Sequence, residues 1–124
     1  MTIRKILVVD DSATERHVLG EMLTRQGMQV VFAETGEMGV AKAKSEKPDL
    51  IMMDIVMPGM NGFQATRAVT HDPETRHIPV IICTTKGQET DKIWGIRQGA
   101  RDYVVKPVGL ADLLGKIGKI AALN

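Results

Sequence analysis

Residues 50–54 read Leu-Ile-Met-Met-Asp, four consecutive apolar residues followed at once by an acid. A strand that is apolar on consecutive positions is typical of a parallel sheet whose two faces are both covered by helices. Four more short apolar runs, several of them of the same kind, lie at residues 6–9, 29–33, 80–83 and 103–105. The sequence therefore predicts five strands in a parallel sheet, the third of them over residues 50–53.

Helix-length segments separate these runs. Residues 12–26 carry apolar side chains at helical spacing before Gly27, namely Val18, Leu19, Met22 and Leu23. The last segment has a clearer apolar stripe, made of Leu110, Leu113, Leu114, Ile117, Ile120 and Ala121. Further helices are expected over about 36–45, 61–71 and 88–98. The order (βα) five times predicts a doubly wound α/β fold, in which ligands gather at the carboxyl ends of the strands.

Composition restricts the classes of function. The 124 residues are the size of one domain, so residues 1–124 are expected to form a single domain with no output domain. Sixteen basic residues against fifteen acidic ones give a net charge of +1, which suggests neither nucleic acid nor anionic lipid as a partner. The single cysteine, Cys83, cannot form an internal disulfide, and the N-terminal apolar run is too short for a signal peptide or a membrane span. A cytoplasmic location is expected.

Chemically versatile side chains stand at the predicted carboxyl ends of four strands. They are Asp10, Asp11, Asp54, Thr84, Thr85 and Lys106. Clustered carboxylates repel one another unless a cation neutralises them, and magnesium prefers oxygen ligands of this kind. Such a set permits phosphoryl transfer, with Lys106 as a second positive charge and Thr84 as a hydroxyl donor. An aspartate would be the nucleophile, and the spacing alone leaves open which one.

Several separated strings resemble the response-regulator receiver family, and together they cover the whole chain. They are Val8-Val9-Asp10-Asp11-Ser12, Met53-Asp54-Ile55-Val56-Met57-Pro58-Gly59-Met60-Asn61-Gly62, Thr84-Thr85 and Val105-Lys106-Pro107. The resemblance implies the CheY-like, flavodoxin-like fold with strand order 2-1-3-4-5. It also implies that Asp54 accepts phosphate from a histidine kinase of the CheA-like kind. Magnesium would be held by Asp10, Asp11, Asp54 and the backbone carbonyl of Val56.

The same resemblance assigns the remaining roles. Thr84 would hydrogen-bond the phosphoryl oxygens, Lys106 would pair with them, and Tyr103 would be the aromatic residue that moves when Thr84 shifts. The Lys106–Pro107 step resembles one that is often a cis peptide in the family. A downstream protein would bind the face made by the fourth helix, fifth strand and fifth helix. Trp94, in that fourth helix, has either an interface or a packing role.

Three further residues are expected to modulate the phosphoryl lifetime. In the family, positions two after the phosphosite and two after the threonine flank the path of the attacking water, and here they are Val56 and Lys86. Val56 offers no hydrogen bond to orient water, Lys86 could shield the phosphoryl oxygens, and Thr85 adds bulk. Slow hydrolysis is the expected result.

Other function classes fit less well. A phosphohydrolase of the haloacid-dehalogenase type needs an acid two residues after its nucleophile, where this chain has Val56. A nucleotide or flavin binder would carry a glycine-rich loop after the first strand, and a phosphorylation-independent module would lack site residues. Stand-alone receivers of this size resemble regulators of chemotaxis and of type IV pilus twitching motility. The run from Trp94 to Ala100 is more similar to the pilus group.

Overall fold

The computed structural model describes residues 2–85 and 89–123, in which strands and helices alternate along the chain. The strands are β1 (Lys5–Val9), β2 (Gln29–Ala33), β3 (Leu50–Asp54), β4 (Val80–Thr85) and β5 (Asp102–Lys106). The helices are α1 (Ala13–Thr24), α2 (Gly36–Glu46), α3 (Gly62–His71), α4 (Glu89–Arg97) and α5 (Leu110–Ala122). None of these helices is long and apolar enough to cross a membrane.

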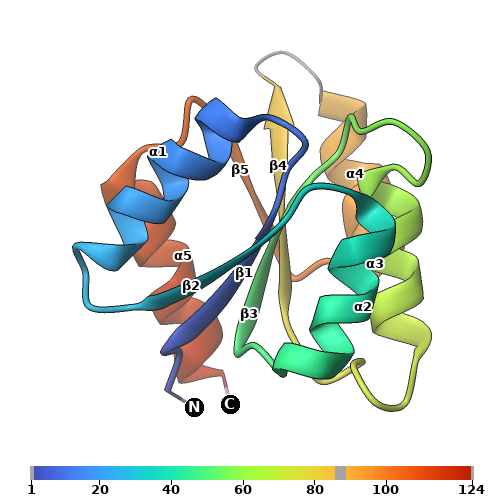
Figure 1. Cartoon of the computed structure of the whole chain (residues 1–124), viewed down its shortest axis with the longest axis horizontal. Helices are drawn as coiled ribbons and strands as arrows, with labels where there is room; N and C mark the ends of the chain where they lie inside the picture. Colours follow the sequence, from blue (N-terminus) through green and yellow to red (C-terminus); the bar gives the residue numbers. More distant parts are fainter. Residues whose placement is uncertain (1, 86–88, 124) are drawn as a thin grey trace.

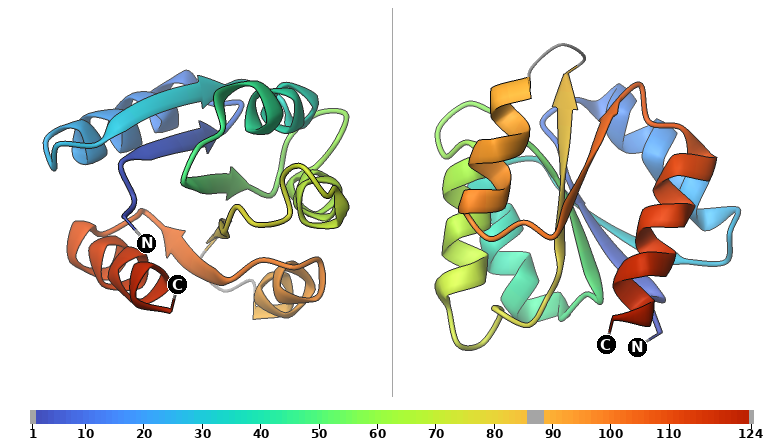
Figure 2. Two further views of the ribbon diagram at one scale, coloured as in Figure 1. Left: turned by 90° about the horizontal axis from the view of Figure 1, so that it is seen from below. Right: turned by 180° about the vertical axis from the view of Figure 1, so that it is seen from behind.

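The strands form one parallel sheet in the order β2-β1-β3-β4-β5. Helices α1 and α5 cover one face, and α2, α3 and α4 cover the other (Figure 1). Figure 2 shows the same three layers from below and from behind. The predicted doubly wound α/β fold, its strand order included, is therefore confirmed.

The central strand β3 explains why the predicted strands are apolar throughout. Ile51 and Met53 pack into the core beneath α2 and α3, while Leu50 and Met52 pack into the core beneath α1 and α5. Successive side chains of a strand point to opposite faces, so a strand buried on both faces needs an apolar residue at nearly every position.

Side-chain caps begin helices α1 and α3. The Ser12 hydroxyl accepts a hydrogen bond from the Glu15 backbone N–H at 3.2 Å and begins α1. Asn61 begins α3 in a capping box, in which its side chain and that of Gln64 each accept a backbone N–H at 2.9 Å. Both helices therefore start close to the carboxyl edge of the sheet.

The strands run further than predicted at this edge. Asp54, Thr84, Thr85 and Lys106 lie within strands rather than after them, because the parallel ladder continues through the pairs Asp54–Cys83 and Thr85–Lys106. The prediction for the first helix was wrong at Val18, which is exposed, whereas Leu19 and Leu23 are buried. The buried face expected for the last helix is confirmed.

Candidate functional site

The acidic cluster lies where two neighbouring strands end. Asp10 follows β1, and Asp54 is the last residue of β3, the strand paired with β1 through Val9 and Met53. Carboxylate oxygens of Asp10, Asp11 and Asp54 lie within 4.8 Å of one another. Asp10 is 2% and Asp54 7% exposed, whereas Asp11 is open to solvent. The structure thus brings together the three acids that the sequence placed at strand ends.

Lys106 reaches these acids from β5, two strands away from β3. Its ammonium nitrogen lies 2.9 Å from Asp54 Oδ1 and 3.3 Å from Asp10 Oδ2. One lysine charge cannot balance three ionised carboxylates, so the cluster keeps an excess of negative charge. A hard divalent cation with oxygen ligands fits such a donor set, and magnesium is the common choice for one or two carboxylates with phosphate oxygens.

Burial and pairing shift two pKa values in the cluster. Burial raises the pKa of Asp54, the hydrogen bond from Lys106 opposes this rise, and the charge of Asp10 adds to it, so the pKa stays above its ordinary value. Burial alone would lower the pKa of Lys106, but its hydrogen bond to Asp54 and the charges of Asp54 and Asp10 raise it. The lysine is therefore held in its charged form beside the carboxylates.

The two predicted switch residues are linked through β5. Thr84 is fully buried, and its hydroxyl donates to the Val104 carbonyl at 3.4 Å. The half-buried Tyr103 ring has the ammonium of Lys92 at 4.6 Å and that of Lys116 at 4.5 Å from its centroid. Lys116 also donates a hydrogen bond to the Tyr103 carbonyl. A movement of the Thr84 hydroxyl would therefore change its hydrogen bond to Val104, the residue that follows Tyr103.

Two of the three predicted modulating residues, Val56 and Thr85, are exposed to solvent. Val56 is 75% exposed, and Thr85 is exposed at the end of β4. Lys86 lies outside the described residues. The peptide bond between Lys106 and Pro107 is cis, as the resemblance implied.

Arg16 was not among the residues predicted from the sequence. Its guanidinium donates to the backbone carbonyl of Asp10 at 2.7 Å. No local pattern of the sequence marks this contact before the chain is folded.

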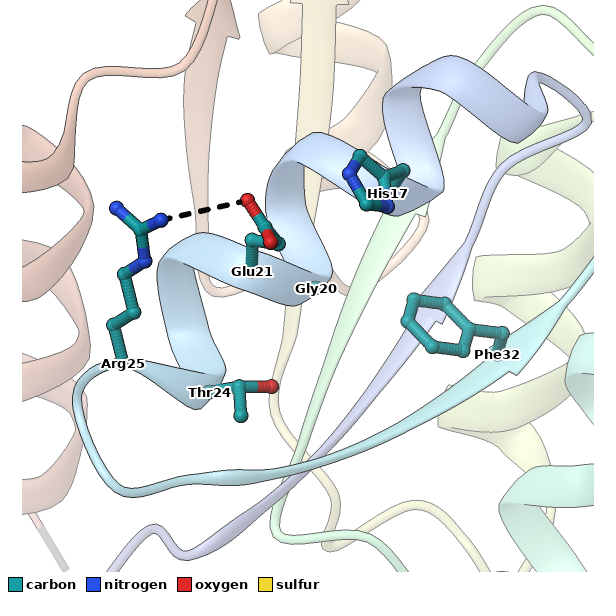
Figure 3. A pocket seen from close by; sticks show the side chains of 6 residues that line it. All are labelled: His17, Gly20, Glu21, Thr24, Arg25 and Phe32. Atoms are coloured by element: carbon teal, nitrogen blue, oxygen red, sulfur yellow. Dashed lines mark ion pairs between the residues drawn. The ribbon is translucent and has the colours of Figure 1, made fainter.

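A surface hollow of about 290 Å³ lies between α1 and β2. Figure 3 shows Phe32 of β2 facing Gly20, with the Glu21–Arg25 ion pair beside it. A Cβ atom on Gly20 would lie 2.5 Å from Cζ of the Phe32 ring, so a larger residue here would require the partly exposed ring to turn aside. This hollow contains none of the acids of the cluster.

Comparison with known proteins identifies the family. A profile of the response regulator receiver domain matches residues 6–118. The chain belongs to the response regulator receiver family. It is 61% identical to Protein PilH of Pseudomonas aeruginosa PAO1 over 118 residues, which are 95% of this chain and 98% of PilH. It is 38% identical to Response regulator PleD of Caulobacter vibrioides over 91% of this chain, but it spans only 25% of PleD.

Solved receiver structures share the fold. A putative response regulator from Chloroflexus aurantiacus superposes with a TM-score of 0.92 at 30% identity, covering 98% of this chain and 99% of that one. Chemotaxis protein CheY4 of Vibrio cholerae gives 0.86 at 31% identity, with coverage of 95% and 98%. The receiver domain of sensor histidine kinase PA1611 from P. aeruginosa PAO1 gives 0.82 at 29% identity, with coverage of 91% and 93%, and has magnesium coordinated in its active site cleft.

Membership in this family decides between the classes that the sequence left open. A receiver is the regulator of a two-component system and acts as a switch, not as an enzyme that turns over a separate substrate.

Proposed function

We propose that this receiver accepts a phosphoryl group on Asp54, with magnesium held by Asp10, Asp11, Asp54 and the backbone carbonyl of Val56. The observation that carries this proposal is the position of Asp54 along the sheet edge. In the strand order, β3 lies between β1, which leads into Asp10, and β5, which ends at Lys106. A phosphoryl group on Asp54 would therefore lie close both to Asp10 and Asp11 and to the ammonium of Lys106, which is 2.9 Å from Asp54 Oδ1.

Asp10 is a weaker candidate for the nucleophile, because hydrogen bonds engage both of its carboxylate oxygens, whereas Lys106 is bonded to one oxygen of Asp54. Asp10 Oδ1 accepts the Ser12 backbone N–H at 2.9 Å, and Asp10 Oδ2 accepts Lys106 at 3.3 Å. Asp11 is exposed, and solvent would compete there with a phosphodonor. Asp54 is buried, and the ammonium of Lys106 lies beside its carboxylate, where it can neutralise charge on a transferred phosphoryl group.

The reaction is the transfer of a phosphoryl group from a phosphohistidine of a CheA-like histidine kinase. As the phosphorus–oxygen bond to ionised Asp54 forms, the phosphorus–nitrogen bond breaks and its electron pair stays on the imidazole. Lys106 stabilises the charge on the transferred oxygens, and the Thr84 hydroxyl turns from Val104 to donate to one of them. Bound magnesium would neutralise further charge on the same oxygens. Loss of the phosphoryl group to water is slow, because exposed Val56 cannot orient a water molecule.

The output is a change in the face formed by α4, β5 and α5, transmitted from Thr84 to Tyr103. Exposed apolar residues on α4 supply contact area for a protein partner, namely Ile93, Trp94 and Ile96. The guanidinium of Arg97 lies 5.5 Å from the Trp94 ring centroid and adds a positive charge to this surface. Residues 1–124 act as one receiver, whose effect is exerted through that partner.

The pathway is type IV pilus motility, controlled from the cytoplasm. Its support is the 61% identity to PilH over nearly the full length of both chains, against 31% to the chemotaxis protein CheY4. The location is supported by Cys83, a single buried thiol, which suits a reducing compartment.

Phosphorylation from acetyl phosphate with magnesium tests the site. Intact-mass measurement should show one added phosphoryl group on the wild type, none on Asp54→Ala, and none when a chelator removes the metal. Asp112→Ala is the matched control, because this aspartate is exposed on α5 and should leave labelling unchanged. Equal labelling of Asp54→Ala and the wild type would reject Asp54 as the acceptor.

A further inference from the structure

We propose that Arg16 is a positioning residue for the metal site, and that it acts by fixing the peptide between the two neighbouring acids Asp10 and Asp11. This inference rests on the proposed function, because it assigns a role in the magnesium binding proposed above.

The contact is short and sheltered. Arg16 Nη1 donates to the Asp10 carbonyl at 2.7 Å, and the Arg16 side chain is only 16% exposed. Its other partner is weaker, because Nη2 lies 3.9 Å from Glu34 Oε1 and the Glu34 side chain is 68% exposed. The hydrogen bond to the carbonyl is therefore the interaction that determines where the guanidinium lies.

This bond completes the anchoring of Asp10. The Asp10 backbone N–H donates to the Ala33 carbonyl at 3.1 Å, and both carboxylate oxygens are bonded, to Ser12 and to Lys106. Without Arg16 the backbone carbonyl of Asp10 would lose its hydrogen bond, while the backbone N–H and both carboxylate oxygens would keep theirs. The peptide that this carbonyl belongs to leads directly to Asp11.

Asp11 depends on that peptide for its direction. Its side chain is exposed, yet its carboxylate lies within 4.8 Å of those of Asp10 and Asp54. The peptide unit is planar, so holding the Asp10 carbonyl also fixes the positions of the Asp11 nitrogen and Cα, from which the side chain leaves the backbone. Loss of the Arg16 bond would let this peptide rotate and would turn the Asp11 carboxylate away from the other two.

Arginine suits this task better than lysine. The guanidinium is a rigid planar group with a fixed set of donors and stays charged at any ordinary pH, whereas a lysine ammonium is a compact charge on a flexible stem. Groups that orient metal ligands from outside the coordination shell typically change metal affinity by about 10- to 100-fold when they are replaced.

The test is magnesium titration of the unphosphorylated protein, followed by calorimetry or by the amide resonances of residues 10–12. We expect Arg16→Met to raise the dissociation constant for magnesium about tenfold, and Arg16→Lys to give an intermediate value. Arg25→Met is the matched control on the same helix, because Arg25 forms an exposed ion pair with Glu21 and should leave the affinity unchanged. Glu34→Gln should also leave it unchanged, since the proposal rests on the carbonyl bond.

A second readout separates positioning from a general loss of stability. With acetyl phosphate, Arg16→Met should need about ten times more magnesium for half-maximal labelling, and should regain the wild-type rate within about threefold at saturating magnesium. If Arg16→Met does not fold, Arg16→Lys becomes the deciding variant. Magnesium affinity within twofold of the wild type in the deciding variant overturns the positioning role. Failure of the wild type to bind magnesium would instead reject the proposed function.

Discussion

Helices α4 and α5 flank β5 on opposite faces of the sheet, and they are held there very differently (Figure 2). Helix α5 buries Leu113, Ile117 and Ile120 in the core shared with α1. Helix α4 buries only Gly95, and its larger apolar side chains Ile93, Trp94 and Ile96 are about half exposed. One helix is therefore anchored by apolar side chains, and the other by close approach of its backbone.

The difference indicates which of the two can respond to the site. Burying one large aliphatic side chain contributes about 1.5–3 kcal/mol to stability. Helix α5 buries several such side chains, whereas the large apolar side chains of α4 are only about half buried. Segments with few buried apolar contacts open locally at the lowest free energy. A change at Thr84 would thus move α4 more readily than α5. A hollow of about 320 Å³ over α4 is lined by Lys92, Ile93, Ile96 and Arg97.

The largest expected effect on stability comes from replacing a buried isoleucine of α5, which is compared with an exposed isoleucine of α4. Ile117→Ala in α5 should lower the free energy of unfolding by about 3 kcal/mol, because Ile117 is 5% exposed and its removal leaves a cavity. Ile93→Ala in α4, where the side chain is 56% exposed, should cost less than about 1 kcal/mol. Urea denaturation measures both values, and Ile117→Val gives a milder check of the first. Similar losses at the two positions would contradict the contrast.

Replacing one glycine of each helix by alanine should change the stability of the protein in opposite directions. A Cβ at position 95 would lie 2.0 Å from Cδ1 of buried Ile82, so Gly95→Ala should push α4 from the sheet and destabilise the protein by about 1–3 kcal/mol. A Cβ at position 115 would meet nothing within 4 Å, so Gly115→Ala in α5 should stabilise it by about 0.5–1 kcal/mol through helix propensity. Thermal denaturation of the two variants gives the signs. Stabilisation by both would show that α4 does not rest on Gly95.

The smallest expected effect on stability comes from the charge of Asp54 and not from the packing of the helices. The pKa of Asp54 is raised in the folded protein. Protonated Asp54 therefore favours folding at pH values below its unfolded pKa, and this contribution to stability is lost as pH rises through its folded pKa. Without magnesium, Asp54→Asn should therefore melt a few degrees above the wild type at pH 7 and show little difference near pH 3, where Asp54 is protonated. Lys106 keeps Asp10 as a partner in this variant. Equal melting temperatures at pH 7 would show that burial of the Asp54 charge has no net cost.

Much of the fold was predictable because its causes are local. Apolar runs such as residues 50–53 require burial on both faces, and their alternation with helix-length segments leaves few topologies. The site followed from the fold, since carboxyl ends of parallel strands meet at one edge and so collect Asp10, Asp54 and Lys106. The strand order and the assignment of the acceptor needed resemblance to a family, because no local pattern distinguishes one aspartate from another.

The sequence by itself determined the sheet, its acidic edge and the presence of a lysine and a threonine there, because residue type and spacing govern which segments are buried. Only the tertiary structure decided that Arg16 holds the Asp10 carbonyl, that Val18 is exposed and that α4 rests on Gly95. It also decided that Trp94 is half exposed rather than part of the core, a point that the sequence left open. These outcomes depend on how closely elements distant in sequence approach one another. That distance is set by the packing of the whole domain and not by any single segment.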